Sequence, residues 1–322
     1  GVCVAVLVLR NGEEMLDEVN ILEHLGRHVG ISSLLATCLD HTTPPNKCMI
    51  MEYANRGSLD GVLCESFEHG LPVSDSVLLT TAHQVAEAMK HLALYDIIHR
   101  DLATRNVLVY SYSQHLNRDV EVKLTDFGLA VRASSHEPLA PSPAGAGGVV
   151  PQGRWMAPEA LGAQAIFSEK SDVWSFGVFL WELWALNGGH PTGRPYNNVD
   201  DDDLVTQGLK DGSLQLQAAD KTPFPAAAII KECVELDATK RPDFKSLVHD
   251  IQDALYQVRT AQNMGIIDEE ENNCCICFEN PRDILIQPCN HLCLCSVCQN
   301  GLPNNECPLC CTPITSLLKI HA

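Results

Sequence analysis

The chain has 322 residues, which is room for about two domains of ordinary size. Its 22 Lys and Arg stand against 41 Asp and Glu, a formal net charge of −19, so a nucleic-acid backbone would be repelled and is not an expected partner. The opening apolar run Val2–Leu9 is too short for a signal peptide or a membrane span, which predicts a cytoplasmic or nuclear protein. Because most of the cysteines fall between Cys274 and Cys311, we expect metal ligands there rather than disulfides.

Hydrophobic periodicity predicts strands and helices mixed along the first 258 residues. Apolar or alternating runs favour strands over 2–9, 47–53, 106–110 and 120–124. Apolar residues at helical spacing favour helices over 13–25, 78–94, from about 172, from about 204 and over 244–258.

Three polar motifs separate these elements. The run His99-Arg100-Asp101-Leu102-Ala103-Thr104-Arg105-Asn106 follows the helix over 78–94, Asp126-Phe127-Gly128 follows the strand over 120–124, and Ala157-Pro158-Glu159 precedes the long apolar helix opened by Asp172. In this order the motifs resemble a eukaryotic protein kinase over residues 2–258. The tyrosine-kinase branch fits best, because Arg105 follows the Asp by four places and Ala103 stands where serine/threonine kinases usually carry Lys.

The resemblance implies an α+β fold class with a bilobal kinase fold, and it assigns roles to the motifs. Asp101 would accept the proton of the attacking hydroxyl with Arg105 beside it, while Asn106 and Asp126 would hold Mg²⁺ against ATP. The nucleotide itself would contact a second set of matching residues, namely Ala5, Glu18, Met51, Glu52, Ala54 and Leu108. The cofactor implied is MgATP, and the substrates would be proteins.

Two departures put this nucleotide site in doubt. Leu7 stands where the family carries the Lys that bridges the α and β phosphates to a helix Glu, here Glu18, and Leu cannot donate a hydrogen bond or carry charge. No glycine-rich loop precedes the first strand, so the N-lobe is incomplete. Either the N-terminus is truncated or the domain has lost half of its nucleotide clamp. Glu18 would then pair elsewhere or face solvent.

Other matches predict structural roles. Glu159 and Arg241 match a buried ion pair, and Asp172 matches the residue that holds the catalytic loop from below. The run Asp200–Asp203 predicts a helix N-terminal cap, with a divalent metal site as the less favoured alternative. No Tyr or Thr lies between Gly128 and Met156, so the usual phosphorylation switch of tyrosine kinases is absent from that segment.

After an acidic linker over 259–273, residues 274–314 carry four closely spaced pairs of metal-ligand residues. These are Cys274 and Cys277, Cys289 and His291, Cys295 and Cys298, Cys307 and Cys310. Eight such ligands make two tetrahedral zinc sites. The spacing resembles a RING finger of the inhibitor-of-apoptosis type. In that arrangement the first and third pairs hold one Zn²⁺ and the others hold the second, although Cys275 competes with Cys274.

RING fingers bind a ubiquitin-conjugating enzyme, and the resemblance places Ile276, Leu302 and Pro308 at the groove that does so. A purely structural zinc knuckle is the alternative. Cys311 stands where many active RINGs carry Arg, which predicts slower transfer or a different partner. The apolar tail over 315–322 is similar in length to tails through which related RINGs dimerise, so we expect a homodimer.

Three functions compete. The first is a tyrosine-type kinase fused to a RING ubiquitin ligase, and it is supported by Asp101, Asn106 and Asp126. The second is a pseudokinase that recruits substrates for an active RING, and it is supported by Leu7 and the missing glycine loop. A scaffold with neither activity ranks last.

Overall fold

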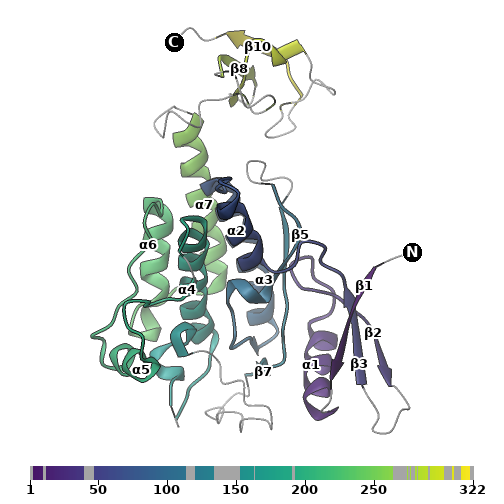
Figure 1. Cartoon of the computed structure of the whole chain (residues 1–322), viewed down its shortest axis with the longest axis vertical. Helices are drawn as coiled ribbons and strands as arrows, with labels where there is room; N and C mark the ends of the chain where they lie inside the picture. The colour runs from purple at the N-terminus through teal and green to yellow at the C-terminus, as the bar shows by residue number, and fades with distance from the viewer. Residues whose placement is uncertain are drawn as a thin grey trace.

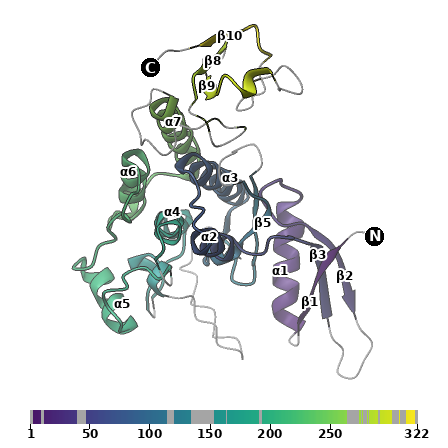
Figure 2. The ribbon, with the colours of Figure 1, turned by 45° about the horizontal axis from the view of Figure 1, so that its top comes forward.

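The computed structural model describes residues 3–9, 12–39, 47–113, 120–133, 153–162, 164–190, 193–263, 274, 276, 280, 282–288, 291–300, 307 and 313–319. Within these ranges the chain forms a small lobe of strands with one helix, a larger helical lobe, and a third unit of short strands beyond the end of the last helix (Figures 1 and 2). The predicted α+β class is confirmed.

The small lobe contains a three-stranded antiparallel sheet in the order β1-β3-β2. Its strands are β1 (Val4–Leu9), β2 (Leu34–Leu39) and β3 (Lys47–Glu52). Helix α1 (Gly12–Leu25) lies along one face, as Figure 2 shows, and buries Val19, Leu22 and Leu25 with Met49 and Met51 of the central strand. Because strand residues alternate between faces, this apolar contact fixes the register of β3.

The larger lobe is built around two long helices, α3 (Asp75–Leu94) and α4 (Glu169–Asn187). Helix α4 is apolar on nearly every side and is buried along most of its length, which is why it lies at the centre of the lobe. Four further helices surround this centre: α2 (Leu59–Glu68), α5 (Asp202–Asp211), α6 (Phe224–Cys233) and α7 (Phe244–Asn263).

Short strands carry the polar motifs between the two lobes. Strand β5 (Val107–Ser111) pairs with β6 (Glu121–Leu124), and β4 (Ile97–Ile98) pairs with β7 (Val131–Arg132). The loop that begins at His99 follows β4, and a single 3₁₀ turn over Thr104–Asn106 delivers it into β5. The Asp126 motif follows β6, and the His99 loop runs into β5, the partner of β6, so both motifs lie beside the β5–β6 pair.

The C-terminal unit has its own antiparallel sheet in the order β10-β8-β9. It consists of β8 (Ile284–Gln287), β9 (His291–Leu294) and β10 (Ser316–Lys319). Ile284, Ile286 and Leu294 form a small core with the buried cysteines, separate from the core of the kinase-like lobes. Residues predicted as a separate tail therefore pair with β8 as part of this sheet.

The predicted strands and helices are present, with ends shifted by a few residues. Helix α7 continues to Asn263, past the domain end expected at 258. The sequence prediction lacked β2, α2 and α6. None of the described helices is long and apolar enough to cross a membrane.

Candidate active site and zinc site

The loop after β4 closes around the carboxylate of Asp101. Arg105 Nη2 lies 2.5 Å from Asp101 Oδ1, and Asn106 Nδ2 donates to Asp101 Oδ2 at 2.8 Å and to its backbone oxygen at 2.7 Å. Asn106 is buried, whereas Asp101 and Arg105 remain partly exposed. Three of the four residues predicted to be catalytic thus form one hydrogen-bonded group that a substrate can reach.

Helix α4 fixes this loop through a buried carboxylate. Asp172 accepts hydrogen bonds from the backbone N–H of His99 at 2.7 Å and of Arg100 at 3.0 Å. Burial raises the pKa of Asp172 to about 7, although these two donors favour its charged form. Arg100 has a φ of 70°, a left-handed conformation that costs a non-glycine residue free energy, so the surrounding contacts hold it there.

A second buried carboxylate on α4, Glu182, holds the same loop and was missed from sequence. Its two oxygens accept from the backbone N–H of Thr104 at 3.0 Å and from the Thr104 hydroxyl at 2.9 Å. Thr104 directly precedes Arg105, so Glu182 positions the partner of Asp101. An acidic residue inside the apolar stretch of α4 was the available signal.

Burial raises the pKa of Glu182 to about 7, and this predicts a pH dependence of stability. Between about pH 4.5 and 7 the folded state binds this proton more tightly than the unfolded state does, so the free energy of unfolding falls as pH rises. Glu182→Gln replaces the titrating carboxyl with a neutral amide. In this variant the free energy of unfolding should fall between pH 5 and pH 7.5 by roughly 2 kcal/mol less than it does in the parent. Urea unfolding of both proteins at pH 5 and pH 7.5 measures it. Parallel pH profiles would show that Glu182 does not titrate in this range.

The Asp126 motif lies next to the catalytic loop. His99 Nε2 donates to the Thr125 carbonyl oxygen at 3.2 Å, and the His99 ring lies 5.1 Å from the buried ring of Phe127. Burial lowers the pKa of His99, while the nearby carboxylates of Asp101 and Asp126 act in the opposite direction. Because the other ring nitrogen of His99 accepts from the Asp101 N–H at 3.3 Å, one imidazole joins Asp101 to the residue that precedes Asp126, and the two motifs lie side by side. Asp126 is exposed.

Glu18 of α1 contacts the Asp126 motif and not the first strand. Its Oε1 accepts from the Phe127 N–H at 3.3 Å, and burial, followed by the Asp126 carboxylate, raises the pKa of Glu18. Leu7 is paired with Met49, so it lies on the α1 face of the sheet, and it is 41% exposed. Glu18 therefore pairs elsewhere, one of the two outcomes expected for it.

The remaining predicted nucleotide contacts border the crossing between the lobes. Ala5 is paired with the buried Met51 across β1 and β3, Ala54 follows two residues after β3 ends, and Leu108 lies on β5. These positions come from three segments of the chain.

The side chain of Glu52 is occupied by protein groups. Its Oε2 lies 2.8 Å from Lys123 Nζ on β6, and its Oε1 accepts from the Ser33 N–H at 2.7 Å. Lys123 also lies over the ring of Tyr110, 4.5 Å from its centroid. These contacts tie the end of β3 to the strand that carries Asp126. Sequence reasoning missed Lys123, although a Lys inside an apolar strand was a visible signal.

The segment after Gly153 contacts Arg105 through Trp155 and is anchored by Arg154. The guanidinium of Arg105 lies 5.0 Å from the ring centroid of Trp155, which shields the ion pair from one side. The neighbouring Arg154 is buried and donates to the backbone oxygens of Pro195, Tyr196 and Val199 at 2.6–2.9 Å, and its Nε donates to Asp202 at 2.6 Å. Arg154 thus anchors the segment after Gly153 to the loop before α5.

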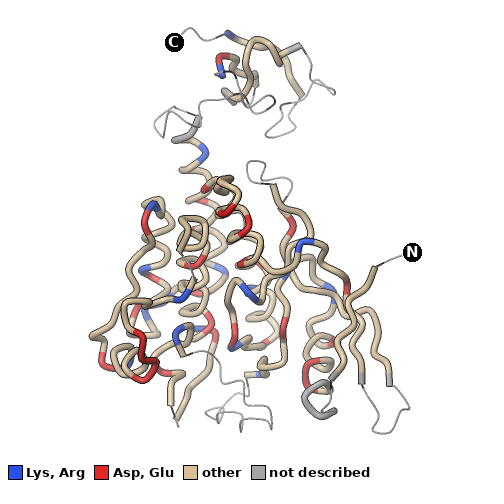
Figure 3. Tube along the Cα trace, in the orientation of Figure 1, with Lys and Arg blue, Asp and Glu red and all other residues tan. Residues whose placement is uncertain are grey.

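The predicted structural residues lie where expected. Arg241 donates to both carboxylate oxygens of Glu159 at 2.6 and 3.0 Å, and the Arg241 side chain is fully buried. Asp201 caps α5 by accepting from the N–H groups of Asp203 and Leu204. Figure 3 shows acidic residues gathered at this helix start. Because Asp202 pairs with Arg154 and Arg194, the run is a cap and an ion-pair partner, and these contacts leave little support for a metal site.

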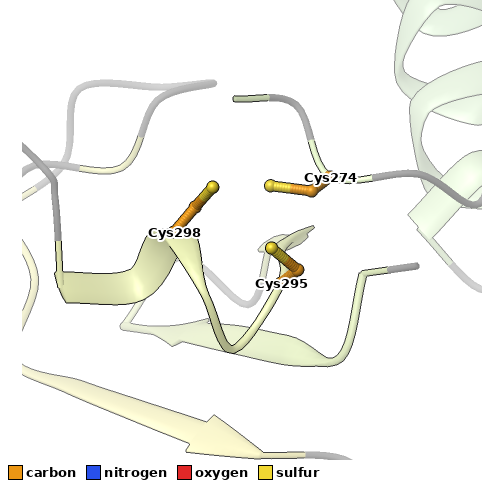
Figure 4. A group of neighbouring side chains, drawn as sticks. All are labelled: Cys274, Cys295 and Cys298. Atoms are coloured by element: carbon orange, nitrogen blue, oxygen red, sulfur yellow. The ribbon is translucent and has the colours of Figure 1, made fainter. Parts of the chain in front are cut away.

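The C-terminal unit brings three predicted zinc ligands together. The sulfurs of Cys274, Cys295 and Cys298 all lie within 4.8 Å of one another and point toward a common centre (Figure 4). A tetrahedral Zn²⁺ with Zn–S bonds of about 2.3 Å needs sulfurs about 3.8 Å apart, and this spacing lies within the 4.8 Å limit, so the three residues fit a zinc ion. Cys274 and Cys295 are buried, as closed structural sites require. The fourth expected ligand, Cys277, lies outside the described residues.

Fewer residues of the second predicted zinc site are described. Cys307 is buried in the small core, and His291 begins β9. Cys289 and Cys310 lie outside the described residues, as do Leu302 and Pro308 of the predicted groove. Ile276, the described member of that groove, is 47% exposed and so is accessible to a partner.

Comparison with known proteins agrees with this division. The family model of protein tyrosine and serine/threonine kinases matches residues 4–251, and that of the C3HC4-type RING finger matches residues 270–317. The chain is 37% identical over 255 residues to mitogen-activated protein kinase kinase kinase 10 of Mus musculus and of Homo sapiens, which covers 76% of the chain and 24% of each relative. It is also 37% identical over 232 residues to human mitogen-activated protein kinase kinase kinase 11, covering 70% of the chain and 24% of the relative. The chain thus spans about a quarter of the length of these relatives.

Proposed function

The chain belongs to the protein tyrosine and serine/threonine kinase family, and we propose that its kinase domain transfers the γ-phosphate of MgATP to a protein hydroxyl. The observation that carries this proposal is the hydrogen-bonded group of Asp101, Arg105 and Asn106, held beside Asp126 by two buried carboxylates of α4.

In this proposal each side chain performs one task. Asp101 orients the acceptor hydroxyl and takes its proton, and Arg105 keeps the Asp101 carboxylate in place. The Asn106 amide oxygen and the exposed Asp126 carboxylate would hold Mg²⁺, which supplies charge neutralisation for the phosphates. Phosphoryl transfer depends mostly on such positioning and on electrostatic stabilisation.

The phosphate clamp is the weak part of this site. Leu7 removes a charge-assisted contact worth about 1.5–3 kcal/mol, which corresponds to one or two orders of magnitude in rate. Glu18, freed from that Lys, accepts the Phe127 N–H and keeps the Asp126 motif against α1. We therefore propose slow transfer with weak nucleotide binding.

Restoring the missing cation tests the clamp. Leu7→Lys places an ammonium on the α1 face of β1, on the side of the sheet from which Glu18 projects toward the Asp126 motif. We expect MgATP to raise the melting temperature of this variant by several degrees more than that of the parent, and peptide phosphorylation to increase about tenfold or more. Thermal shift and phosphate incorporation measure the two effects.

Val6→Lys is the matched control, since Val6 is the adjacent and exposed position on the opposite face of β1. It should behave like the parent in both assays. If MgATP stabilises neither the parent nor the Leu7→Lys variant, and no phosphate appears on any peptide, the kinase proposal fails.

A second candidate function is a pseudokinase that recruits clients for the RING finger. The partly exposed Leu7 at the clamp position favours it, because no described cation takes the place of the missing Lys beside Glu18. The Asp101→Asn variant separates the two candidates. If the domain is an active kinase, the variant should lose peptide phosphorylation. If the domain only recruits clients, the variant should ubiquitinate them as the parent does.

We propose that the RING finger acts as a ubiquitin ligase. Its support is the zinc-ligand triad of Cys274, Cys295 and Cys298 beside the exposed Ile276 of the predicted groove, which also includes Leu302 and Pro308. Zinc in a closed four-ligand site is structural, so the metal shapes the surface and takes no part in transfer. The partner is a ubiquitin-conjugating enzyme, and clients held by the kinase domain would receive ubiquitin.

The acceptor residue and the setting complete the proposal. Arg105 four places after Asp101, and Ala103 where serine/threonine kinases usually carry Lys, support tyrosine as the acceptor, whereas the relatives are named mitogen-activated protein kinase kinase kinases. Phosphoamino acid analysis of a modified peptide library decides between them. Zinc ligation by thiols suits a reducing compartment, so we place the protein in the cytoplasm or nucleus.

We also propose a homodimer through the RING finger. Among the described strands, β10 is one edge of the C-terminal sheet with no partner on its outer side, and Leu318 on it is half exposed, so a backbone edge and an apolar side chain are available to a second copy. Light scattering at micromolar concentration should report twice the chain mass for the parent and the single mass for Leu318→Lys. A parent that is monomeric throughout would end this proposal.

A further inference from the structure

Two thiols face each other on the sheet of the small lobe. Cys38 of β2 and Cys48 of β3 are directly paired in the antiparallel register, between the pairs of Thr37 with Met49 and Leu39 with Lys47. Directly opposed residues of antiparallel strands share a face, with Cα atoms about 4.5–5.5 Å apart. Disulfides span Cα separations of about 4.4–6.8 Å. The backbone therefore already holds these residues at disulfide spacing.

The pair is open to small reagents from solvent. Cys38 is exposed and Cys48 is half-buried. Met49 and Met51 on the same strand are buried against α1, and because side chains alternate along a strand, Cys48 points to the opposite face. Figures 1 and 2 show α1 lying along the other side of this sheet.

Each of the other described cysteines of the kinase domain lacks either access to solvent or a second cysteine opposite it. Cys233 is completely buried on α6, and burial raises the pKa of its thiol, so the reactive thiolate is suppressed. Burial also raises the pKa of Cys64 on α2. Cys3 is exposed, but it precedes β1, whose first residue pairs with Glu52 at the far end of β3 from Cys48.

We propose that Cys38 and Cys48 form a reversible oxidation site for peroxides. The exposed Cys38 thiol loses its proton, and the thiolate attacks one peroxide oxygen. The O–O bond breaks to give a sulfenic acid and hydroxide, and the hydroxide takes up the released proton to form one water. The Cys48 thiol then attacks the Cys38 sulfur, the S–O bond breaks, and a second water leaves as the S–S bond forms. Two thiols lose one electron each, and one peroxide is reduced to two waters.

The cross-link would act on the strand that leads to the nucleotide site. It closes the chain between β2 and β3, which restricts the unfolded state and stabilises the small lobe. Strand β3 continues from Cys48 through Met51 to Glu52, whose side chain reaches Lys123 in the other lobe. Oxidation would thus stiffen the sheet behind the predicted adenine contacts. This inference does not depend on kinase or ligase activity.

The test is disulfide mapping on the full, zinc-loaded chain. The protein is treated with a small excess of hydrogen peroxide, remaining thiols are alkylated, and the digest is analysed by mass spectrometry. We expect a peptide pair linked through Cys38 and Cys48, lighter by two hydrogen atoms than the reduced pair and absent after dithiothreitol treatment. The oxidised parent should also melt a few degrees higher than the reduced parent.

Three variants make the result specific. Cys38→Ser and Cys48→Ser should each lose the linked peptide and the thermal shift, and since Cys38 is exposed, its variant should fold normally. Cys64→Ser, which changes a cysteine of another lobe, should keep both. If peroxide converts Cys38 to sulfinic acid while Cys48 stays reduced, or if either residue pairs with a different cysteine, the proposed site is wrong.

Discussion

Replacing Cys295 by Ser will unfold the C-terminal unit and leave the kinase domain folded. Cys295 is buried, and its sulfur is one of three that converge in the zinc site. The core of this unit is too small to fold without help, and a structural zinc contributes about 10–16 kcal/mol to such folding at neutral pH. Zinc content should fall from two ions per chain to at most one, and discharge of ubiquitin from a conjugating enzyme should drop to the rate without the protein.

Cys293→Ala is the matched control for that experiment. Cys293 is a buried cysteine two residues away on β9, outside the expected ligand set. The variant should keep both zinc ions and most of the discharge rate, with a loss of stability of about 1 kcal/mol from the smaller side chain. If Cys295→Ser still binds two zinc ions, Cys295 is not a ligand. If the parent accelerates discharge with none of a broad panel of conjugating enzymes, the ligase proposal fails while the zinc site stands.

Glu159→Ala should destabilise the kinase domain by about 3–5 kcal/mol. The substitution leaves the fully buried guanidinium of Arg241 without its carboxylate, and an uncompensated buried charge is costly. Backbone oxygens of Lys170 and Glu235 accept from the same guanidinium and limit the loss, but they carry no full negative charge. Chemical denaturation followed by tryptophan fluorescence measures the change, because Trp174 lies against Arg241 at 5.0 Å.

Lys240→Ala provides the comparison, since it removes an ion pair from the preceding residue. Lys240 and Asp237 are exposed and their charged atoms are 4.0 Å apart. Exposed pairs of this kind contribute about 0–1 kcal/mol, so this variant should unfold almost as the parent does. If Glu159→Ala and Lys240→Ala lowered the free energy of unfolding by the same amount, burial of the ion pair between Glu159 and Arg241 would contribute nothing to stability.

Sequence reasoning located most of the site because its motifs lie beside strongly periodic elements. The apolar runs of β3 and β6 and the helical spacing in α1 are strong local signals. Asp101, Asn106 and Asp126 follow from motifs whose spacing leaves little freedom. The family and the presence of a RING finger could therefore be predicted before any contact was known, and both are confirmed.

Residues that act through tertiary contacts could not be found in this way. Glu182 and Lys123 are single charged residues within apolar elements, and their partners lie 78 and 71 residues away in the chain. The missed strand β2 is bordered by polar residues and has an irregular register, and α2 is too short for a clear period. Pairing of the C-terminal residues with β8 likewise depends on a partner that local sequence does not specify.

The backbone angles beside the two acids have a practical consequence. Arg100 at φ 70° and Asp126 at φ 61° each hold a conformation that costs a non-glycine residue about 1–3 kcal/mol. A short peptide that spans either motif would relax to the usual negative φ angles. Its carboxylate would then no longer be held in the orientation that it has in the protein. Grafting the catalytic loop alone onto another scaffold would therefore not reproduce the geometry of the site. The graft must include helix α4, whose Asp172 and Glu182 hold the loop.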